Sequence, residues 1–383
     1  MLIRHQDENP IVGRPEPRWL RARRLAAWQR FQKLADPDFR YGQGTGFDPK
    51  TIRLPYQAMT RGEKLPAMAG SVPAGLESGL KAFPVSELDR LWSWHAATAS
   101  RIRVITAAKD EHLKSPLRLE TKLLSNKSAQ ELTVVNAAAG SELAIIEHVS
   151  GAGERAAATF VNAGDNAKVT IISIRDLERH STEFVRCDAK LGRNARVVWL
   201  ECVLGGSFAS SSITNRLLGR GAAAVARTIF CGSGSSRFEL TQTAQHQADT
   251  TSSDLLARGV LDGAARSLYR GHISVARGCP GCEAHQKEDT LLLGERAESS
   301  AIPILEIETD EIECGHGCTV GRLERDQLFY LMSRGLDERT ATKLLVEGFF
   351  QPIVSGMQHF GLEEMVSCLI AGQLAPATSY PCL

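Results

Sequence analysis

The chain has 383 residues, 43% of them hydrophobic, which is enough to bury a large core. Its 45 basic and 44 acidic side chains leave a net charge of +1, so no excess of one sign indicates binding to nucleic acid or to a membrane. The charged start lacks the apolar segment of a signal peptide, and no apolar run approaches the roughly 20 residues of a membrane span. We therefore expect a cytoplasmic protein, in which nine cysteines favour metal, redox or buried-thiol roles over a disulfide framework.

The N-terminal region, residues 1–100, contains two predicted helices. Residues 18–34 place Leu20, Ala27 and Phe31 on one face and several arginines on the others. This pattern favours a helix docked on its own core with a solvated basic face; a helix lying on a membrane surface is the alternative. A second helix is predicted near residues 85–99. The intervening residues 37–84 are rich in Pro and Gly and are predicted to be irregular.

The central region, residues 101–323, has short apolar runs rich in Val, Ile and Thr, which predict β-strands. Turns of one type separate them: Gly164, Gly192 and Gly219 follow one another at intervals of 28 and 27 residues. A strand–turn–strand unit of this size cannot bury its apolar side alone, so neighbouring units must stack. The repetition favours a β-solenoid over a β-sandwich, which would also show short strands.

The C-terminal region, residues 324–383, is predicted to be helical. One helix runs from Asp326 to Arg334 and is stopped by Gly335, which suits a left-handed C-cap. Asp337 is expected to cap the next helix, which should end before Pro352. A last helix is predicted over residues 362–374.

Two cysteines stand close together in the sequence Cys279-Pro280-Gly281-Cys282. Pro at the second position and Gly at the third suit a type II turn, whose ends lie within about 7 Å of each other. The two thiols can bind a metal, form a reversible disulfide or serve structure alone. One C-x-x-C is half of a metal site, so the motif by itself leaves these alternatives open.

A second cluster of soft ligands is Cys314-Gly315-His316-Gly317-Cys318. On a strand, Cys314, His316 and Cys318 share one face, and the two glycines leave the other face open to a close backbone contact. Residues two apart on a strand are separated by about 6.6 Å and residues four apart by about 13 Å. One metal ion can therefore reach an adjacent pair, or all three only if a glycine bends the strand. A core role for all three is the alternative.

Other motifs of enzyme chemistry are absent from the sequence. There is no Gly-Lys dipeptide and so no P-loop for ATP, and neither H-E-x-x-H nor G-x-S-x-G occurs. Cys187, Cys202 and Cys231 fall on predicted strands and are expected to be small buried hydrophobes.

From Gln247 to Phe350 the chain resembles the SufB/SufD family of iron–sulfur cluster assembly proteins. The resemblance is carried by residues 267–271, 289–294 and 303–307, and above all by residues 314–321, 326–330 and 333–335. It implies a right-handed parallel β-helix flanked by helical ends. It also implies a non-enzymatic scaffold that holds a transient iron–sulfur cluster at an interface between two subunits, either a homodimer or a SufB/SufD heterodimer.

The resemblance further implies a separate SufC-type ATPase bound at the C-terminal helices and a sulfur donor supplied by a cysteine desulfurase. The chain departs from SufB-like scaffolds, which carry a cysteine where this chain has Glu288 and a His-Glu pair where it has His316-Gly317. Cys314 and His316 match the SufD-like pattern, whereas Cys318, Cys279 and Cys282 are extra. We predict Cys314 and His316 as the principal cluster ligands, and Glu288 as an oxygen ligand or base.

Cys318 is predicted to substitute for Cys314 if the strand bends, and Cys279 with Cys282 to complete the site or hold a second metal. Two other functions are kept beside the scaffold. One is a structural partner of the ATPase that holds no cluster of its own. The other is a metalloenzyme on a β-helix that uses His316 and Glu288.

Overall fold

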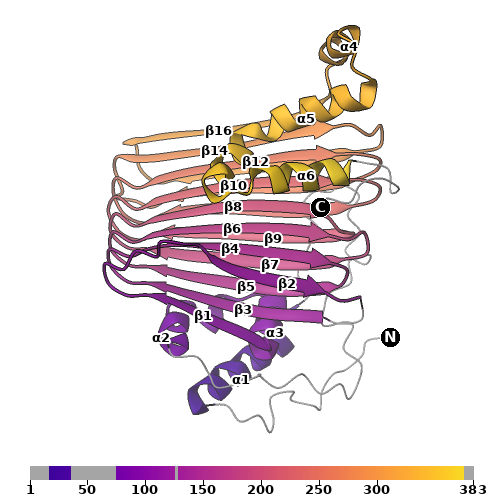
Figure 1. Cartoon of the computed structure of the whole chain (residues 1–383). Helices are drawn as coiled ribbons and strands as arrows, with labels where there is room; N and C mark the ends of the chain where they lie inside the picture. The colour runs from indigo at the N-terminus through magenta and orange to yellow at the C-terminus, as the bar shows by residue number, and fades with distance from the viewer. Residues whose placement is uncertain (1–16, 36–74, 126–127, 375–383) are drawn as a thin grey trace.

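The computed structural model describes residues 17–35, 75–125 and 128–374. Its centre is a stack of two parallel sheets with eight strands each, in the orders β1-β3-β5-β7-β9-β11-β13-β15 and β16-β14-β12-β10-β8-β6-β4-β2. We call the first sheet A and the second sheet B. Successive strands alternate between the sheets, and each strand pairs with the strand two places later in the chain. This topology confirms the parallel β-helix and excludes the β-sandwich (Figure 1).

The strands of sheet A have these bounds: β1 Arg101–Ala107, β3 Ser128–Ala137, β5 Glu154–Ala163, β7 Thr182–Leu191, β9 Phe208–Leu217, β11 Arg237–His246, β13 Arg266–Val275 and β15 Glu298–Ile307. The strands of sheet B are β2 Leu117–Leu123, β4 Glu142–Gly151, β6 Lys168–Leu177, β8 Arg196–Gly205, β10 Ala223–Gly232, β12 Ser252–Leu261, β14 Cys282–Leu292 and β16 Ile312–Arg322. The helices are α1 Arg18–Lys33, α2 Leu76–Lys81, η3 Val85–Glu87, α3 Arg90–Thr98, α4 Arg325–Ser333, α5 Glu338–Val354, η4 Ser355–Phe360 and α6 Glu363–Gln373.

The recurring glycines of the sequence lie where the turns of successive units pack on one another. A Cβ atom on Gly219 would lie 2.1 Å from the backbone nitrogen of Arg193 in the turn below, so only glycine fits there. Two residues further on, the same turns need a left-handed backbone, which Asn166 (φ 58°), Asn194 (φ 52°) and Gly221 (φ 71°) adopt. The repeat seen in the sequence is therefore the repeat of the solenoid.

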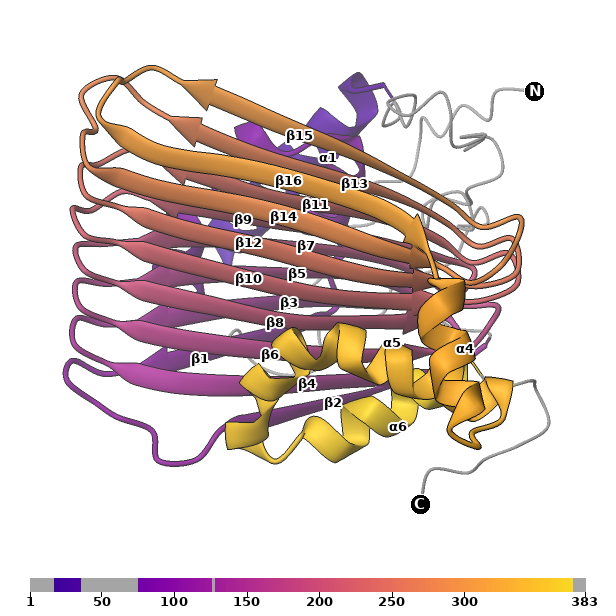
Figure 2. The ribbon, with the colours of Figure 1, turned by 90° about the horizontal axis from the view of Figure 1, so that it is seen from above.

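Helices cover the outer faces of both sheets (Figures 1 and 2). Leu20, Trp28 and Phe31 of α1 pack with α3 and with outward residues of sheet A such as Phe160. On the opposite side, helices α5 and α6 cover sheet B, where Phe350 belongs to the same apolar cluster as Cys202 and Cys231. The prediction that these two cysteines, and Cys187 in the interior, are buried is confirmed.

Three local expectations need correction. Helix α5 does not end before Pro352 but continues to Val354, because a proline this close to the helix C-terminus removes only one of the last backbone hydrogen bonds. The basic face of α1 is not fully solvated, since Arg24 is 1% exposed and donates to the carbonyl oxygens of Ala97 and Ala99 at 3.0 and 2.7 Å. Most of the region predicted as irregular lies outside the described residues, but its end contains the short helix α2.

Other expectations for the helical ends hold. Gly335 has a φ of 95°, as a left-handed cap requires, and Asp337 Oδ1 accepts a hydrogen bond from Thr340 N at 2.9 Å. Over residues 17–35, 75–125 and 128–374, none of the helices has the length and apolar character needed to span a membrane.

Candidate functional site

The Cys/His cluster lies on β16, the last strand of sheet B, at one end of the solenoid. Its register with β14 pairs Cys314 with Ala284, His316 with Gln286 and Cys318 with Glu288. The three β14 residues are buried and face the interior, so Cys314, His316 and Cys318 face the same way, as the alternation predicted. No described strand or helix lies over this end (Figure 2). As a result Cys314 is half-buried, while His316 and Cys318 are exposed.

Glu288 lies one strand below Cys318, in the interior of the solenoid. It is fully buried, with 0% exposure. Thr290 Oγ1 donates a hydrogen bond to Glu288 Oε1, whereas Oε2 has no hydrogen-bond partner, and Glu288 forms no salt bridge within the described residues. Burial raises the pKa of Glu288 to about 7, against the opposing effect of the Thr290 hydrogen bond. A carboxylate oxygen is thus buried unpaired beneath an exposed thiol.

Gln286 repeats this arrangement below His316. It is 3% exposed, and neither Oε1 nor Nε2 of its amide has a hydrogen-bond partner in the described part of the chain. Buried polar atoms without a partner also occur elsewhere in the described chain, such as Asp188 Oδ1 and Asn215 Nδ2, but Glu288 and Gln286 are neighbours on the inward face of one strand. Both lie directly under the Cys/His row. Together the two side chains form a buried polar layer directly beneath the Cys/His row.

The thiols of this row are not ionised by their surroundings alone. Burial raises the pKa of Cys314, and burial followed by the negative charges of Glu288 and Asp289 raises that of Cys318. A bound metal cation would lower both, as metal ligation of a thiol requires. Within the described residues no three His, Cys, Asp or Glu side chains are placed to hold a metal ion together. The strand therefore offers a partial ligand set.

The glycines of the motif leave the outer face of β16 bare. A Cβ atom on Gly315 would meet no atom nearer than His285 Nδ1, at 3.5 Å, and one on Gly317 no atom nearer than Lys287 Cγ, at 4.0 Å. Within this chain, then, the glycines are not required by crowding. They leave room on that face for another backbone.

Cys279 and Cys282 form a separate group in the turn between β13 and β14. Both are buried, at 5% and 1% exposure, and both are free thiols. Burial, and then the neighbouring Cys282 and Asp249, raise the pKa of Cys279. Cys282 faces the interior beside Ile312 of β16, two residues before Cys314. The structure thus places this pair one strand below the Cys/His row but not within it.

A chain of buried polar side chains, which no sequence motif predicts, extends from this end into the solenoid. Tyr269 donates to Gln242 Oε1 at 3.0 Å, and Gln242 Nε2 donates to Thr228 Oγ1 at 2.8 Å, which in turn donates to Glu201 Oε2 at 3.0 Å. Beyond Glu201 the interior becomes ionic. The ion-paired residues there are Arg175, Glu183, Arg155, Glu147 and Glu131.

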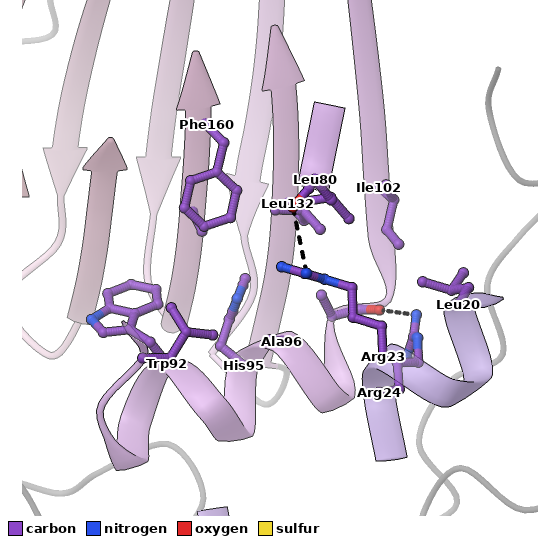
Figure 3. A pocket seen from close by; sticks show the side chains of 13 residues that line it. Leu20, Arg23, Arg24, Leu80, Trp92, His95, Ala96, Ile102, Leu132 and Phe160 are labelled. Carbon is purple, nitrogen blue, oxygen red and sulfur yellow. Dashed lines mark hydrogen bonds between the residues drawn. The ribbon is translucent and has the colours of Figure 1, made fainter. Parts of the chain in front are cut away.

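A small pocket lies between α1, α3 and sheet A (Figure 3). Its polar lining is committed to structure: Arg23 donates to the carbonyl oxygens of Leu80 and Phe83, and His95 Nε2 lies 2.9 Å from the carbonyl oxygen of Glu131. Burial lowers the pKa of His95 to about 4, so this imidazole is neutral at physiological pH. The pocket fixes the N-terminal helices and offers no group for a ligand.

Comparison with known proteins assigns the chain to a family. Residues 121–349 match the family described as SUF system FeS cluster assembly, SufBD core domain, which covers more than half of the 383 residues. The chain belongs to the SufBD family. All six candidate site residues lie within the matched segment, as do helix α4 and most of α5.

Individual relatives support this assignment. The iron–sulfur cluster assembly protein SufD of Bacillus subtilis is 31% identical over 211 residues, 55% of this chain and 48% of the relative. SufD of Escherichia coli is 26% identical over 241 residues, 62% of this chain and 57% of the relative. An iron–sulfur cluster assembly SufBD family protein of Mycobacterium leprae is 30% identical over 200 residues, 52% of this chain and 23% of the relative. The similarity thus spans about half the length of the two SufD proteins, and less of the third.

Within the SufBD solenoid, two site residues escaped the sequence analysis. Gln286 was missed because a lone glutamine on a strand has no motif. Tyr269 was missed because its hydrogen-bond partner Gln242 lies on β11, 27 residues away in the sequence. The available signal for Gln286 was its place in the inward series of β14, which it shares with Cys282 and Ala284 and which alternates with exposed polar residues.

Proposed function

We propose that this chain is a scaffold subunit for iron–sulfur cluster assembly that receives iron and sulfide at the open end of its solenoid. The supporting observation is that two buried side chains directly beneath Cys318 and His316 carry polar atoms without a hydrogen-bond partner in the described residues: Oε2 of Glu288 and both amide atoms of Gln286. Thiolate, imidazole and carboxylate together suit iron. The cluster is the cargo of this site, not a resident cofactor. The family supports assembly as the process in which the site acts.

The incomplete ligand set favours a site shared between two subunits. Cys314 and His316 are about 6.6 Å apart along the strand, so one chain presents two ligands to a cluster and a second chain supplies the rest. The end strands suit such a contact, since Ile304, Ile307 and Val320 are 37%, 40% and 43% exposed around the Cys/His row. A homodimer and a SufB/SufD-type heterodimer both satisfy this geometry.

The ligand assignment is tested by anaerobic reconstitution with ferrous iron and sulfide. We expect the parent chain, with its partner subunit, to bind both, and Cys314→Ser and His316→Ala to lose most of the iron, sulfide and visible absorption. Cys231→Ala, a buried thiol under α5, is the matched control and should retain them. If both site variants behave like the parent, the structural-partner function replaces the scaffold function.

The interface is tested by comparing two residues of equal exposure. Val320 at the open end and Leu218 in a turn remote from it are both 43% exposed. Val320→Lys is expected to abolish subunit association, measured by light scattering after gel filtration, whereas Leu218→Lys leaves it unchanged. Equal association of the two variants would place the interface elsewhere.

Helix α4 is the proposed docking site for a SufC-type ATPase. It projects from the solenoid (Figure 1) and exposes Phe329 by 73%, Tyr330 by 56% and Met332 by 41%. Exposed apolar residues clustered on one helix indicate a protein contact. Since the chain has no P-loop, the ATP chemistry would belong to that partner. Sulfur would come from a donor charged by a cysteine desulfurase, and the complex would be cytoplasmic.

Substitution tests this docking site better than deletion of residues after Leu323. Deletion also removes α5 and α6, whose Phe350 and Ile370 cover the apolar outer face of sheet B. We expect Phe329→Ser with Tyr330→Ser to end co-purification with the ATPase, while Leu25→Ser, an exposed leucine of α1, leaves it intact. Unchanged co-purification of the double variant would reject the α4 site.

A further inference from the structure

The turn that joins β13 to β14 carries two cysteines at its ends, Cys279 and Cys282. Gly281 has a φ of 68°, which the third residue of a type II turn requires, so the turn predicted for Cys279-Pro280-Gly281-Cys282 is present. Cys282 Sγ lies 3.2 Å from the carbonyl oxygen of Cys279. Both thiols are free, and their side chains are turned inward while Gly278 and Gly281 face solvent.

The surroundings of this pair suit thiol chemistry better than metal binding. Thr251 Oγ1 lies 3.2 Å from Cys282 Sγ and 2.7 Å from His246 Nδ1. The other nitrogen of His246 is engaged too, since Nε2 lies 2.9 Å from Ser253 Oγ. The imidazole is therefore committed to hydroxyl groups, and no third metal ligand accompanies the two thiols within the described residues. What remains is a vicinal dithiol with Thr251 as a positioning residue for Cys282.

The pair lies beside the candidate cluster site. Cys279 and Cys282 belong to the apolar cluster against which Cys314 packs. Cys282 is the register partner of Ile312, two residues before Cys314 on the neighbouring strand. Neighbouring strands are about 4.8 Å apart, so a small species released at the dithiol is already beside the Cys/His row.

We propose that Cys279 and Cys282 reduce the sulfane sulfur of a persulfide to sulfide. The Cys279 thiol, the less buried of the two, attacks the outer sulfur of a persulfide R–S–SH, takes that sulfur and releases R–SH. The Cys282 thiol then attacks the inner sulfur of the Cys279 persulfide, forms the Cys279–Cys282 disulfide and expels the terminal sulfur, which leaves with the remaining protons as hydrogen sulfide.

The step is balanced: one persulfide and two thiols give one thiol, one hydrogen sulfide and one disulfide. The sulfane sulfur gains two electrons, and each cysteine sulfur loses one. This inference rests on the proposed function, because it supplies the oxidation state of sulfur that cluster assembly consumes. It assigns the dithiol to sulfide production and leaves cluster ligation to Cys314 and His316.

A single-turnover experiment tests the proposal on the full chain. The protein is reduced, freed of reductant and mixed anaerobically with glutathione persulfide, and released sulfide is trapped with a bimane reagent. The parent is expected to release about one sulfide per chain and to lose two hydrogens in intact mass, as exchange to an internal disulfide requires. Cys282→Ser should stop at the persulfide, with one added sulfur atom and no sulfide above a protein-free blank. Cys231→Ala, whose thiol is buried under α5, should match the parent.

Two results would overturn the proposal. One is sulfide release by the Cys279→Ser/Cys282→Ser double variant equal to that of the parent. The other is loss of cluster content in the same double variant when iron and ready-made sulfide are supplied, because the pair would then be ligands. Retention of the cluster under those conditions is the expected result. Failure of the proposed function would give a different result: the parent chain itself would then form no cluster from iron and sulfide.

Discussion

The polar interior of the solenoid differs between its two halves. In the half towards β3, the buried charges are opposed by one another: Arg155 pairs with Glu131 and Glu183 at 2.8 Å each and also with Glu147, and Arg175 pairs with Glu183 at 3.3 Å. In the half towards β16, Glu288 is as deeply buried and has no ion pair within the described residues. The buried carboxylates of the first half are opposed by arginines of the chain, whereas Glu288 in the second half is opposed by no cation among the described residues.

The ion-paired charges of the first half can be explained by folding alone. Glu288 and Gln286 are explained by the proposed cluster site. Buried ion pairs of good geometry cost little net free energy, whereas a buried group without a partner costs stability unless something else binds it. Glu288 and Gln286 are therefore difficult to explain by folding. Their position under exposed thiol and imidazole groups is the one that the proposed cluster site requires.

Removing the cation of Arg155 should have the largest effect on the free energy of unfolding. Arg155→Met leaves the carboxylates of Glu131, Glu147 and Glu183 without their shared partner, and we expect a loss of about 3–5 kcal/mol in the free energy of unfolding. Denaturant unfolding measures it. Arg193→Met removes a cation that is 64% exposed and should cost less than about 1 kcal/mol. A similar small loss for both variants would show that the interior pairs are not compensating one another.

Glu288→Gln should raise the free energy of unfolding at pH 8, whereas Arg155→Met should lower it. Burial raises the pKa of Glu288 from 4.5 to about 7, so the stability that its proton contributes is fully present below pH 4.5 and is lost as pH rises through 7. At pH 8 the neutral glutamine should therefore make the protein more stable by up to about 3 kcal/mol, with little difference near pH 4.

Glu183→Gln is the matched control in the half towards β3. It removes a buried carboxylate that pairs with both Arg155 and Arg175, so it should lower stability at pH 8, where Glu288→Gln raises it. Unfolding curves at pH 4 and pH 8 for the two variants decide the matter. The same sign for both at pH 8 would remove the distinction between the halves.

Two glutamines sharpen the comparison further. Gln242→Leu leaves the buried hydroxyl of Tyr269 without its acceptor and should cost about 1–3 kcal/mol. Gln286→Leu removes an amide that has no partner within the described residues, so its expected effect on unfolding lies between neutral and slightly stabilising. A large loss for Gln286→Leu would show that its amide is satisfied in solution, by water or by a group outside the described residues.

The smallest effect on stability is expected at His316. Its side chain is exposed on the end strand, so His316→Ala should change the free energy of unfolding by less than about 0.5 kcal/mol. Thermal and denaturant unfolding of the isolated chain measure this. A loss above about 1 kcal/mol would mean that His316 supports the fold, and the effect of the same variant on cluster content would then not report ligation.

The sequence predicted the fold through features with a local cause. Gly192 and Gly219 recur because stacked turns exclude a Cβ atom, and Cys314, His316 and Cys318 share a face because strand residues alternate. The predicted end of α5 was wrong for a local reason as well. The sequence shows Pro352, but it does not show that this proline lies near the C-terminus of the helix.

The interior network could not be predicted, because each of its contacts joins different strands. Arg24 was assigned to a solvated face although its guanidinium reaches the carbonyl oxygen of Ala97, 73 residues away. Glu288 was selected through family resemblance alone, and nothing in its own neighbourhood of the sequence indicates an unpaired oxygen. The predicted ligand roles, the region bounds 1–100, 101–323 and 324–383, and the partners stay predictions.

Because the turns stack directly on one another, the number of repeat units sets the length of the solenoid. Each strand pairs with the strand two places later without a slip in register. An internal deletion or insertion therefore preserves the stack only if it removes or adds a whole unit of 26 to 32 residues, such as the spacing from Ser128 to Glu154 or from Arg266 to Glu298. One unit moves the end strand by about 4.8 Å. The distance between the helices that cover β3 and the thiols on β16 therefore changes in steps of one strand spacing. Relatives of different length should differ in the number of stacked strands and keep the same geometry at the end of the stack.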